Sequence, residues 1–264
     1  MNSPPVKLLT IAGSDSGGAA GLQADLRAWA VLGGYGMSAI TAVTAQNSRA
    51  VLAVHFLPPD FVAAQIGAVL ADYGADAAKT GFLGRVEIVA AVAAALRPFA
   101  LPHLVVDPVL VNHKGAAMFP PAVTAAYVAH LLPLADLITP NPAEAALLAG
   151  LEVRCLRDGE TAVRRLRDLG PKHVLLKRIP AGKRYVDLFY DGQTVHRLAA
   201  EKIKTANTHG AGDVLSAAVC FYLARGEGVE TAVGRAHAFT QTALLRSAPW
   251  QLGGGHGPVL TING

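Results

Sequence analysis

Residues 204–219 read Lys-Thr-Ala-Asn-Thr-His-Gly-Ala-Gly-Asp-Val-Leu-Ser-Ala-Ala-Val, so a glycine turn opens directly into an apolar run typical of a buried helix. The first N–H groups of a helix lack partners within the helix, and the helix dipole adds positive potential there. The turn at Gly210, Ala211 and Gly212 therefore predicts an anion site. Asp213 lies at its mouth, where a carboxylate can orient or deprotonate a hydroxyl group. An anion cradle beside a base suits phosphoryl transfer to an alcohol; the alternative is a tight turn in which Asp213 caps the helix.

Short apolar runs alternate with Ala-rich segments of helical character along the 264 residues. Alternation of this kind predicts an α/β fold with a mostly parallel sheet and helices on both faces. Asp191-Gly192 between two apolar runs predicts one small antiparallel hairpin. The expected strands cover 6–12, 38–45, 75–80, 103–107, 136–139, 173–177, 186–190 and 194–198. The expected helices cover 21–32, 59–70, 86–96, 121–132, 142–148, 160–169, 214–225 and 230–247. No linker or repeat divides the chain, so we expect a single domain over 1–264.

Polar clusters follow almost every expected strand. In open parallel sheets, ligands bind outside the carboxyl ends of the strands. We therefore expect the functional residues in these clusters, which span 13–21, 46–47, 79–84, 107–115, 141–144, 177–178 and 210–213.

The first clusters suggest a flat, nitrogen-bearing ligand. The loop Gly13–Gly21 matches neither a dinucleotide fingerprint nor a P-loop, but its glycines let a ligand approach the backbone; the alternative is a tight strand-to-helix connection. Gln46 offers a donor and an acceptor side by side, as the edge of an aminopyrimidine requires, although a lone Gln is also a common surface residue. Phe82 can stack on an aromatic ring or simply fill the core.

The later clusters suggest a cation and phosphate groups. Asp107 and Glu144 follow strand ends, where carboxylates can hold Mg²⁺ against substrate phosphates; the alternative for Glu144 is a favourable charge in the first turn of a helix. Lys177 can reach phosphate oxygens as a point charge. The nine histidines show no zinc-binding spacing.

Composition argues against several classes of protein. The net charge is +4, and no basic run is interleaved with aromatic residues, so we expect no nucleic-acid partner. No apolar run reaches the roughly 18 residues of a membrane span, and the N-terminus has no signal-peptide pattern. Cys155 and Cys220 have no metal-ligand spacing. We expect a cytoplasmic protein.

Ordered segments from one end of the chain to the other carry a family resemblance. They are Thr10–Asp15, Gly21–Leu26, Thr41–Asn47, Ala78–Gly81, Val105–Val109, Ile138–Glu144, Lys204–Gly212 and Gly255–Pro258. Together they resemble the hydroxymethylpyrimidine/phosphomethylpyrimidine kinases of thiamine biosynthesis, in the ribokinase-like superfamily. The resemblance implies a three-layer sandwich and an ATP-dependent enzyme. Its reaction would phosphorylate 4-amino-5-hydroxymethyl-2-methylpyrimidine, its monophosphate, or both, ending at the diphosphate.

The resemblance also implies roles for individual residues. The set expected around the pyrimidine is Gly13, Ala20, Asp25, Gln46, Phe82, Val109 and His209. The set expected at ATP is Asn141, Lys177, Thr208, Gly210 and Gly212, with Asp107 and Glu144 at Mg²⁺. The expected catalytic set is Asp213 with the turn 210–212 and Lys177. A homodimer is expected.

The chain departs from the family pattern at four places. Asp213 stands where Cys is usual, Phe82 where Met is frequent, Asn112-His113-Lys114-Gly115 where Ala-Lys-Ser-Gly is usual, and Arg178 where Gly is usual. Asp213 and the 112–115 loop motivate one alternative, a vitamin B6 (pyridoxine or pyridoxal) kinase on the same fold. A third hypothesis is a non-catalytic regulator that binds a pyrimidine or a nucleotide.

Overall fold

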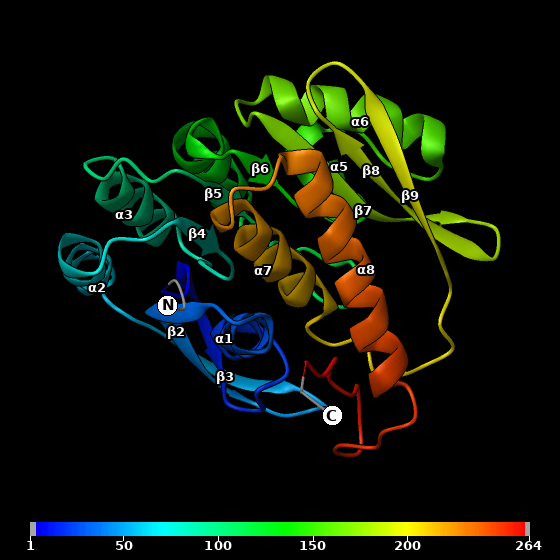
Figure 1. The fold of residues 1–264 in the computed structure, drawn as a ribbon, viewed down its shortest axis with the longest axis horizontal. Helices are drawn as coiled ribbons and strands as arrows, with labels where there is room; N and C mark the ends of the chain where they lie inside the picture. Colours follow the sequence, from blue (N-terminus) through cyan, green and yellow to red (C-terminus); the bar gives the residue numbers. More distant parts are fainter. Residues whose placement is uncertain (1–3, 262–264) are drawn as a thin grey trace.

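The computed structural model describes residues 4–261, and a nine-stranded sheet runs through them in the order β3-β2-β1-β4-β5-β6-β7-β8-β9 (Figure 1). Adjacent strands from β2 to β7 pair in parallel, whereas β3, β8 and β9 each run antiparallel to their neighbours. The strands are β1 Lys7–Asp15, β2 Tyr35–Gln46, β3 Val51–Phe56, β4 Ala77–Thr80, β5 Leu104–Val106, β6 Leu137–Ile138, β7 His173–Ala181, β8 Arg184–Tyr190 and β9 Val195–Glu201.

Helices cover both faces of this sheet because successive strand residues point to opposite sides. Leu9 and Ile11 of β1 join one core, under α2 to α6, while Leu8 joins a second core under α1, α7 and α8. The helices are α1 Gly21–Leu32, α2 Pro59–Asp72, α3 Val86–Leu96, α4 Pro121–Ala126, α5 Pro142–Ala149, α6 Leu156–Asp168, α7 Ala211–Ala224 and α8 Val229–Ser247. The predicted α/β class and three layers are confirmed. No helix within residues 4–261 is both long and apolar enough to cross a membrane.

Two expected elements differ from the structure. The predicted hairpin is present as β8 and β9, but a further antiparallel strand, β3, adds to the opposite edge of the sheet. The expected helix over 121–132 is α-helical only to Ala126. It continues as a π turn over Tyr127–Leu131 and a 3₁₀ turn over Leu132–Leu134, which contains Pro133.

The sheet gathers charged side chains on one side of its carboxyl edge. Val105 and Leu175 face the core under α7, so Asp107 and Lys177, two positions later, project to the same side. In β4, Ala77 faces the same core, so Lys79, two positions later, also projects to this side. These three side chains therefore meet the beginning of α7.

Candidate active site

A large cavity, called the main cavity here, opens at the carboxyl ends of the parallel strands. It is lined by every predicted site residue except Asp25. These lining residues are Gly13, Ala20, Gln46, Phe82, Asp107, Val109, Asn141, Glu144, Lys177, Thr208, His209, Gly210, Ala211, Gly212 and Asp213. The structure thus brings together segments that are distant in the sequence, at the sheet edge where a ligand was expected.

Asp15 shapes the glycine-rich loop that forms one wall of the main cavity. Its carboxylate accepts hydrogen bonds from the backbone N–H groups of Gly17 (2.8 Å), Ala19 (2.9 Å) and Ala20 (2.9 Å). The loop folds back so tightly that a Cβ atom on Gly21, where φ is +60°, would lie 2.3 Å from the Gly13 carbonyl oxygen. This role of Asp15 was not predicted from the sequence, although an Asp before such a loop is a turn-forming signal.

The turn before α7 packs directly against that loop. A Cβ atom on Gly210, where φ is +80°, would lie 1.9 Å from the Ala19 carbonyl oxygen, so only glycine fits. The C-terminal segment holds the turn from the other side, because the His209 N–H donates to the Gly257 carbonyl (3.0 Å) and Val259 N–H donates to the His209 carbonyl (2.9 Å). The turn therefore has a fixed position between the two walls of the cavity.

Asp213 shares a buried ammonium group with Asp25. Lys79 Nζ lies 2.6 Å from Asp25 Oδ1 and 3.3 Å from Asp213 Oδ1, and the side chains of Lys79 and Asp25 are fully buried. Among the described residues, no backbone N–H donates to the Asp213 carboxylate, so the helix-capping alternative is not supported. Instead Lys79, which the sequence reasoning left without a role, fixes Asp213.

Asp25 is the one predicted substrate residue that does not line the main cavity. Its carboxylate accepts from Thr10 Oγ1 (2.6 Å) and Lys79 Nζ, and it is enclosed beneath the cavity. Burial raises the pKa of Asp25 to about 7; the negative charge of Asp213 adds to this shift and Lys79 opposes it. Asp25 is therefore part of the buried ion pair with Lys79.

A second charged group forms around Asp107. Lys177 Nζ donates to Asp107 Oδ1 (2.8 Å), and Ser216 Oγ donates to Oδ2 (3.1 Å). Burial acts to raise the pKa of Asp107, but the charges of Lys177 and Lys79 outweigh it and lower the pKa. Asp107 is therefore an anion at neutral pH.

Glu144 completes a capping box at the start of α5. Its Oε2 accepts from the Asn141 N–H (2.9 Å), and Asn141 Oδ1 accepts from the Glu144 N–H (3.0 Å). The alternative interpretation put Glu144 in the first turn of a helix, and the structure has it there, held by the capping box. Burial raises the pKa of Glu144 to about 8, with a further contribution from Asp107, while Lys177 acts against it.

The two carboxylates suit a loosely held cation. Within residues 4–261, no group of three or more His, Cys, Asp or Glu side chains is arranged to enclose a metal ion. Mg²⁺ is commonly held by one or two carboxylates, with water and substrate phosphates completing the shell. Asp107 and Glu144, both lining the main cavity, fit that donor set.

Aromatic side chains build the opposite wall of the main cavity. Phe82 stacks on Phe56 with ring centroids 5.8 Å apart and meets Phe119 edge to face at 5.4 Å. The Gln46 amide nitrogen lies 2.9 Å from His209 Nε2, within hydrogen-bond distance, and both residues line the main cavity. Neither Phe56 nor Phe119 was predicted as a site residue. The segment Val51–Phe56 is rich in β-forming residues and follows a polar turn, so the strand that carries Phe56 could have been predicted.

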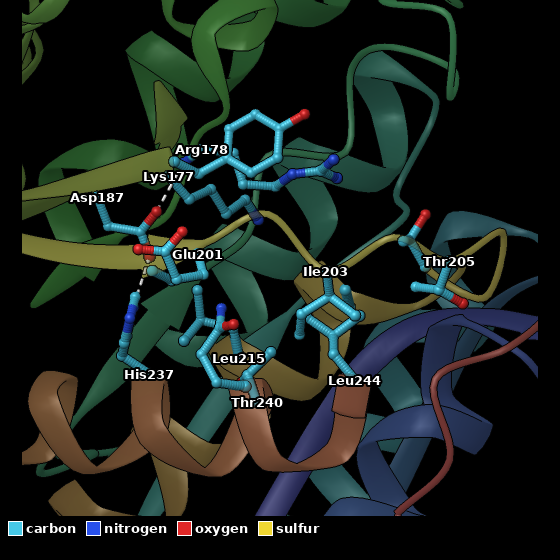
Figure 2. Close-up of a pocket in the computed structure, with 16 residues that line it drawn as sticks. Lys177, Arg178, Asp187, Glu201, Ile203, Thr205, Leu215, His237, Thr240 and Leu244 are labelled. Atoms are coloured by element: carbon cyan, nitrogen blue, oxygen red, sulfur yellow. Dashed lines mark hydrogen bonds and ion pairs between the residues drawn. The ribbon is translucent and has the colours of Figure 1, made fainter. Parts of the chain in front are cut away.

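A second pocket, called the side pocket here, lies between β8, β9, α7 and α8 (Figure 2). Leu215, Thr240 and Leu244 form its helical side, facing Arg178 and Glu201 from the strands. It shares Lys177, Arg178, Thr208, Ala211 and Gly212 with the main cavity. The two spaces therefore meet at Lys177 and the start of α7.

Comparison with known proteins identifies the family. The phosphomethylpyrimidine kinase family matches residues 15–260. Hydroxymethylpyrimidine/phosphomethylpyrimidine kinase of Rhizobium meliloti is 45% identical, with 95% of each chain covered. A thiamine biosynthesis bifunctional protein of Geobacter sulfurreducens is 43% identical over 97% of this chain, which spans about half (52%) of that relative.

Solved structures share the fold. Pyridoxal kinase of Staphylococcus aureus, in complex with AMP-PCP, superposes with a TM-score of 0.88 at 35% identity, covering 97% of this chain and 93% of that chain. Phosphomethylpyrimidine kinase of Clostridium difficile superposes with a TM-score of 0.82 at 34% identity, covering 90% of this chain and 99% of that chain. Sequence profile, near-full-length relatives and fold agree, and the chain therefore belongs to the phosphomethylpyrimidine kinase family.

Proposed function

We propose that this protein is an ATP-dependent kinase that phosphorylates 4-amino-5-hydroxymethyl-2-methylpyrimidine and then its monophosphate, giving the diphosphate for thiamine biosynthesis. The observation that carries the proposal is the meeting of two cavities at the start of α7, with Asp213 on one side and Lys177 at the junction. Relatives that cover this chain almost completely bear the same enzyme name.

The residues divide the work of phosphoryl transfer between them. Asp213 accepts the proton of the substrate alcohol while the alcohol oxygen forms a bond to the γ-phosphorus of ATP. The bond from that phosphorus to the β,γ-bridging oxygen breaks, and ADP leaves. Lys177, Thr208 and the turn 210–212 line the space where negative charge moves, so they neutralise and position the phosphates. In the second round, an oxygen of the monophosphate is the nucleophile.

Asp107 and Glu144 would hold Mg²⁺ beside these phosphates, with Asn141 orienting Glu144 through the capping box. Bound there, the cation supplies positive charge that neutralises the phosphate oxygens. The nucleoside part of ATP would occupy the side pocket. A TM-score of 0.88 to a pyridoxal kinase that carries AMP-PCP supports ATP as the phosphate donor.

The main cavity suits a small heteroaromatic alcohol. The Phe82 wall provides a flat apolar surface, and Gln46 provides a paired donor and acceptor for the ring nitrogen and amino group. Gly13, Ala20, Val109 and His209 complete the proposed substrate site. Asp25 would act on it indirectly, through Lys79 and Asp213.

Vitamin B6 kinase is the second candidate, because pyridoxal kinases are among the solved structures that superpose well. The non-catalytic hypothesis is weaker, since a relative that covers this chain almost completely is named as a kinase. Steady-state kcat/KM for the hydroxymethylpyrimidine, its monophosphate and pyridoxine separates the three. Preference for the pyrimidines supports the proposal, preference for pyridoxine supports the second candidate, and no ATP consumption supports the third.

We further propose a homodimer formed through the outer edge of the sheet. Leu52 of β3 is 72% exposed and does not line the main cavity, unlike its neighbours Val51 and Val54; such exposure is unusual for an apolar residue on an edge strand. We propose that residues 1–264 act as one domain, since all described strands join one sheet. We place the reaction in the cytoplasm, where ATP is supplied.

A further inference from the structure

Arg178 is the only non-glycine residue among those described whose backbone φ is positive, at 65°. This left-handed backbone conformation is unfavourable for a residue that has a Cβ atom, whereas glycine adopts it without strain. Arg178 lies at a β-sheet irregularity, where the pairing of β7 with β8 shifts register between Leu176 and Ile179. The strained backbone is therefore a local feature of one strand pair.

Neighbouring elements hold this conformation in place. The Arg178 N–H donates to Asp187 Oδ1 (2.7 Å), and Asp187 Oδ2 lies 3.0 Å from His237 Nδ1 of α8 (Figure 2). Asp187 of β8 thus contacts the Arg178 backbone directly, and His237 of α8 contacts Asp187. A conformation that costs free energy and is fixed by two elements is a frequent sign of a functional position.

The Arg178 side chain lies where the two pockets meet. It is exposed and lines both of them. Its guanidinium lies 5.2 Å from the centre of the Tyr185 ring, and no carboxylate within residues 4–261 forms an ion pair with it. By contrast, Lys177 beside it is paired with Asp107. Arg178 is therefore a cation at the junction without a paired anion.

The surroundings of Arg178 favour an incoming anion. His256 lies near two other imidazole rings, with ring centroids 5.3 Å from His209 and 6.0 Å from His113. Burial, and then the neighbouring charges of His209, His113 and Arg178, lower the pKa of His256. These three ring side chains line the main cavity together with Arg178, so an anion bound there would have Arg178 as its charged partner and imidazole nitrogens beside it.

We propose that Arg178 contacts the terminal phosphates of ATP, so that its guanidinium moves from the Tyr185 ring onto the phosphate that is transferred. This inference rests on the proposed function. A guanidinium offers several N–H donors to phosphate oxygens, and such charge-assisted hydrogen bonds are stronger than neutral ones. The gain in phosphate binding would offset the backbone strain that a side chain brings to this position.

The test compares Arg178→Gly with Arg178→Lys in nucleotide binding and in urea unfolding. Arg178→Gly removes both the guanidinium and the backbone strain, so we expect an unchanged or higher unfolding midpoint. We also expect binding of AMP-PCP with Mg²⁺ to weaken at least about 10-fold, binding of ADP to weaken less, and binding of AMP to stay within 2-fold. Arg178→Lys should recover part of the AMP-PCP affinity. Arg154→Ala, which removes an exposed arginine outside both pockets, is the matched control.

Two outcomes would overturn the inference. If Arg178→Gly binds AMP-PCP as tightly as the wild type, the side chain only covers Tyr185. If AMP, ADP and AMP-PCP all weaken equally, the variant has altered the side pocket as a whole. Binding is measured without the phosphate acceptor, so a wild type that phosphorylates no pyrimidine would refute the proposed function while leaving the nucleotide series interpretable.

Discussion

Replacing Asp25 by Asn tests the buried ion pair that fixes the proposed base. Asp25 and Lys79 are fully buried and 2.6 Å apart, and Asp213 shares the same ammonium group. Asn keeps nearly the same shape and can still accept from Thr10, but it does not ionise. Any pH-dependent difference between the two proteins therefore reports the ionisation of Asp25.

The raised pKa of Asp25 determines whether the stability of the protein rises or falls with pH. Burial moves the pKa of Asp25 from 3.8 to about 7 in the folded protein. Between these values the folded state keeps a proton that the unfolded state has released, so the stability of the wild type falls as pH rises through this window. At roughly 1.36 kcal/mol per pH unit, a pKa raised from 3.8 to about 7 corresponds to a change in the free energy of unfolding on the order of 4 kcal/mol. Asp25→Asn lacks this contribution, so relative to wild type it should gain about 4 kcal/mol between pH 4 and pH 7.5.

The assay is urea unfolding of both proteins at half-unit steps from pH 4 to pH 8, with the free energy of unfolding extrapolated to water. Asp72→Asn, which changes an exposed carboxylate, is the control and should follow the wild-type curve. Parallel curves for wild type and Asp25→Asn would refute the reasoning, because the ionisation of Asp25 would then be the same in folded and unfolded protein.

Three shorter predictions address the site and its assembly. Asp213→Asn should lower kcat by about 10²- to 10⁴-fold without weakening ATP binding; an unchanged kcat would remove Asp213 as the base. Gln46→Ala should weaken pyrimidine binding by about 1–3 kcal/mol in calorimetry and leave ATP affinity unchanged, and equal pyrimidine affinity would reject the edge contact. Leu52→Lys should shift the protein to monomer in analytical ultracentrifugation with little loss of stability, because Leu52 is 72% exposed in one chain. A dimer as tight as the wild type would place the interface elsewhere.

The layered fold could be predicted because its strands carry their own signal. β1, β5 and β7 are short apolar runs that are buried on both faces, and each ends in a polar cluster. β3 was missed because Val51–Phe56, although rich in β-forming residues, shows no alternation of apolar and polar residues and lies exposed at the edge of the sheet. Because β3 was missed, Phe56, whose ring stacks on Phe82 in the main cavity, was missed as well.

The roles of Asp25 and Arg178 could not be read from sequence. Asp25 is separated by 54 residues from Lys79 and faces it only because α1 packs on β1, the strand that pairs with β4. A fully buried ammonium group between two carboxylates is a tertiary arrangement with no local pattern. The positive φ of Arg178 depends on the register shift between β7 and β8, and Arg has no preference for that conformation.

The most direct test of the account is a time course of product masses from the purified protein with ATP, Mg²⁺ and the hydroxymethylpyrimidine. We expect the monophosphate to appear first and the diphosphate then to accumulate, with two ATP consumed for each diphosphate. A protein that leaves the pyrimidine unchanged, yet phosphorylates pyridoxine under the same conditions, would contradict it.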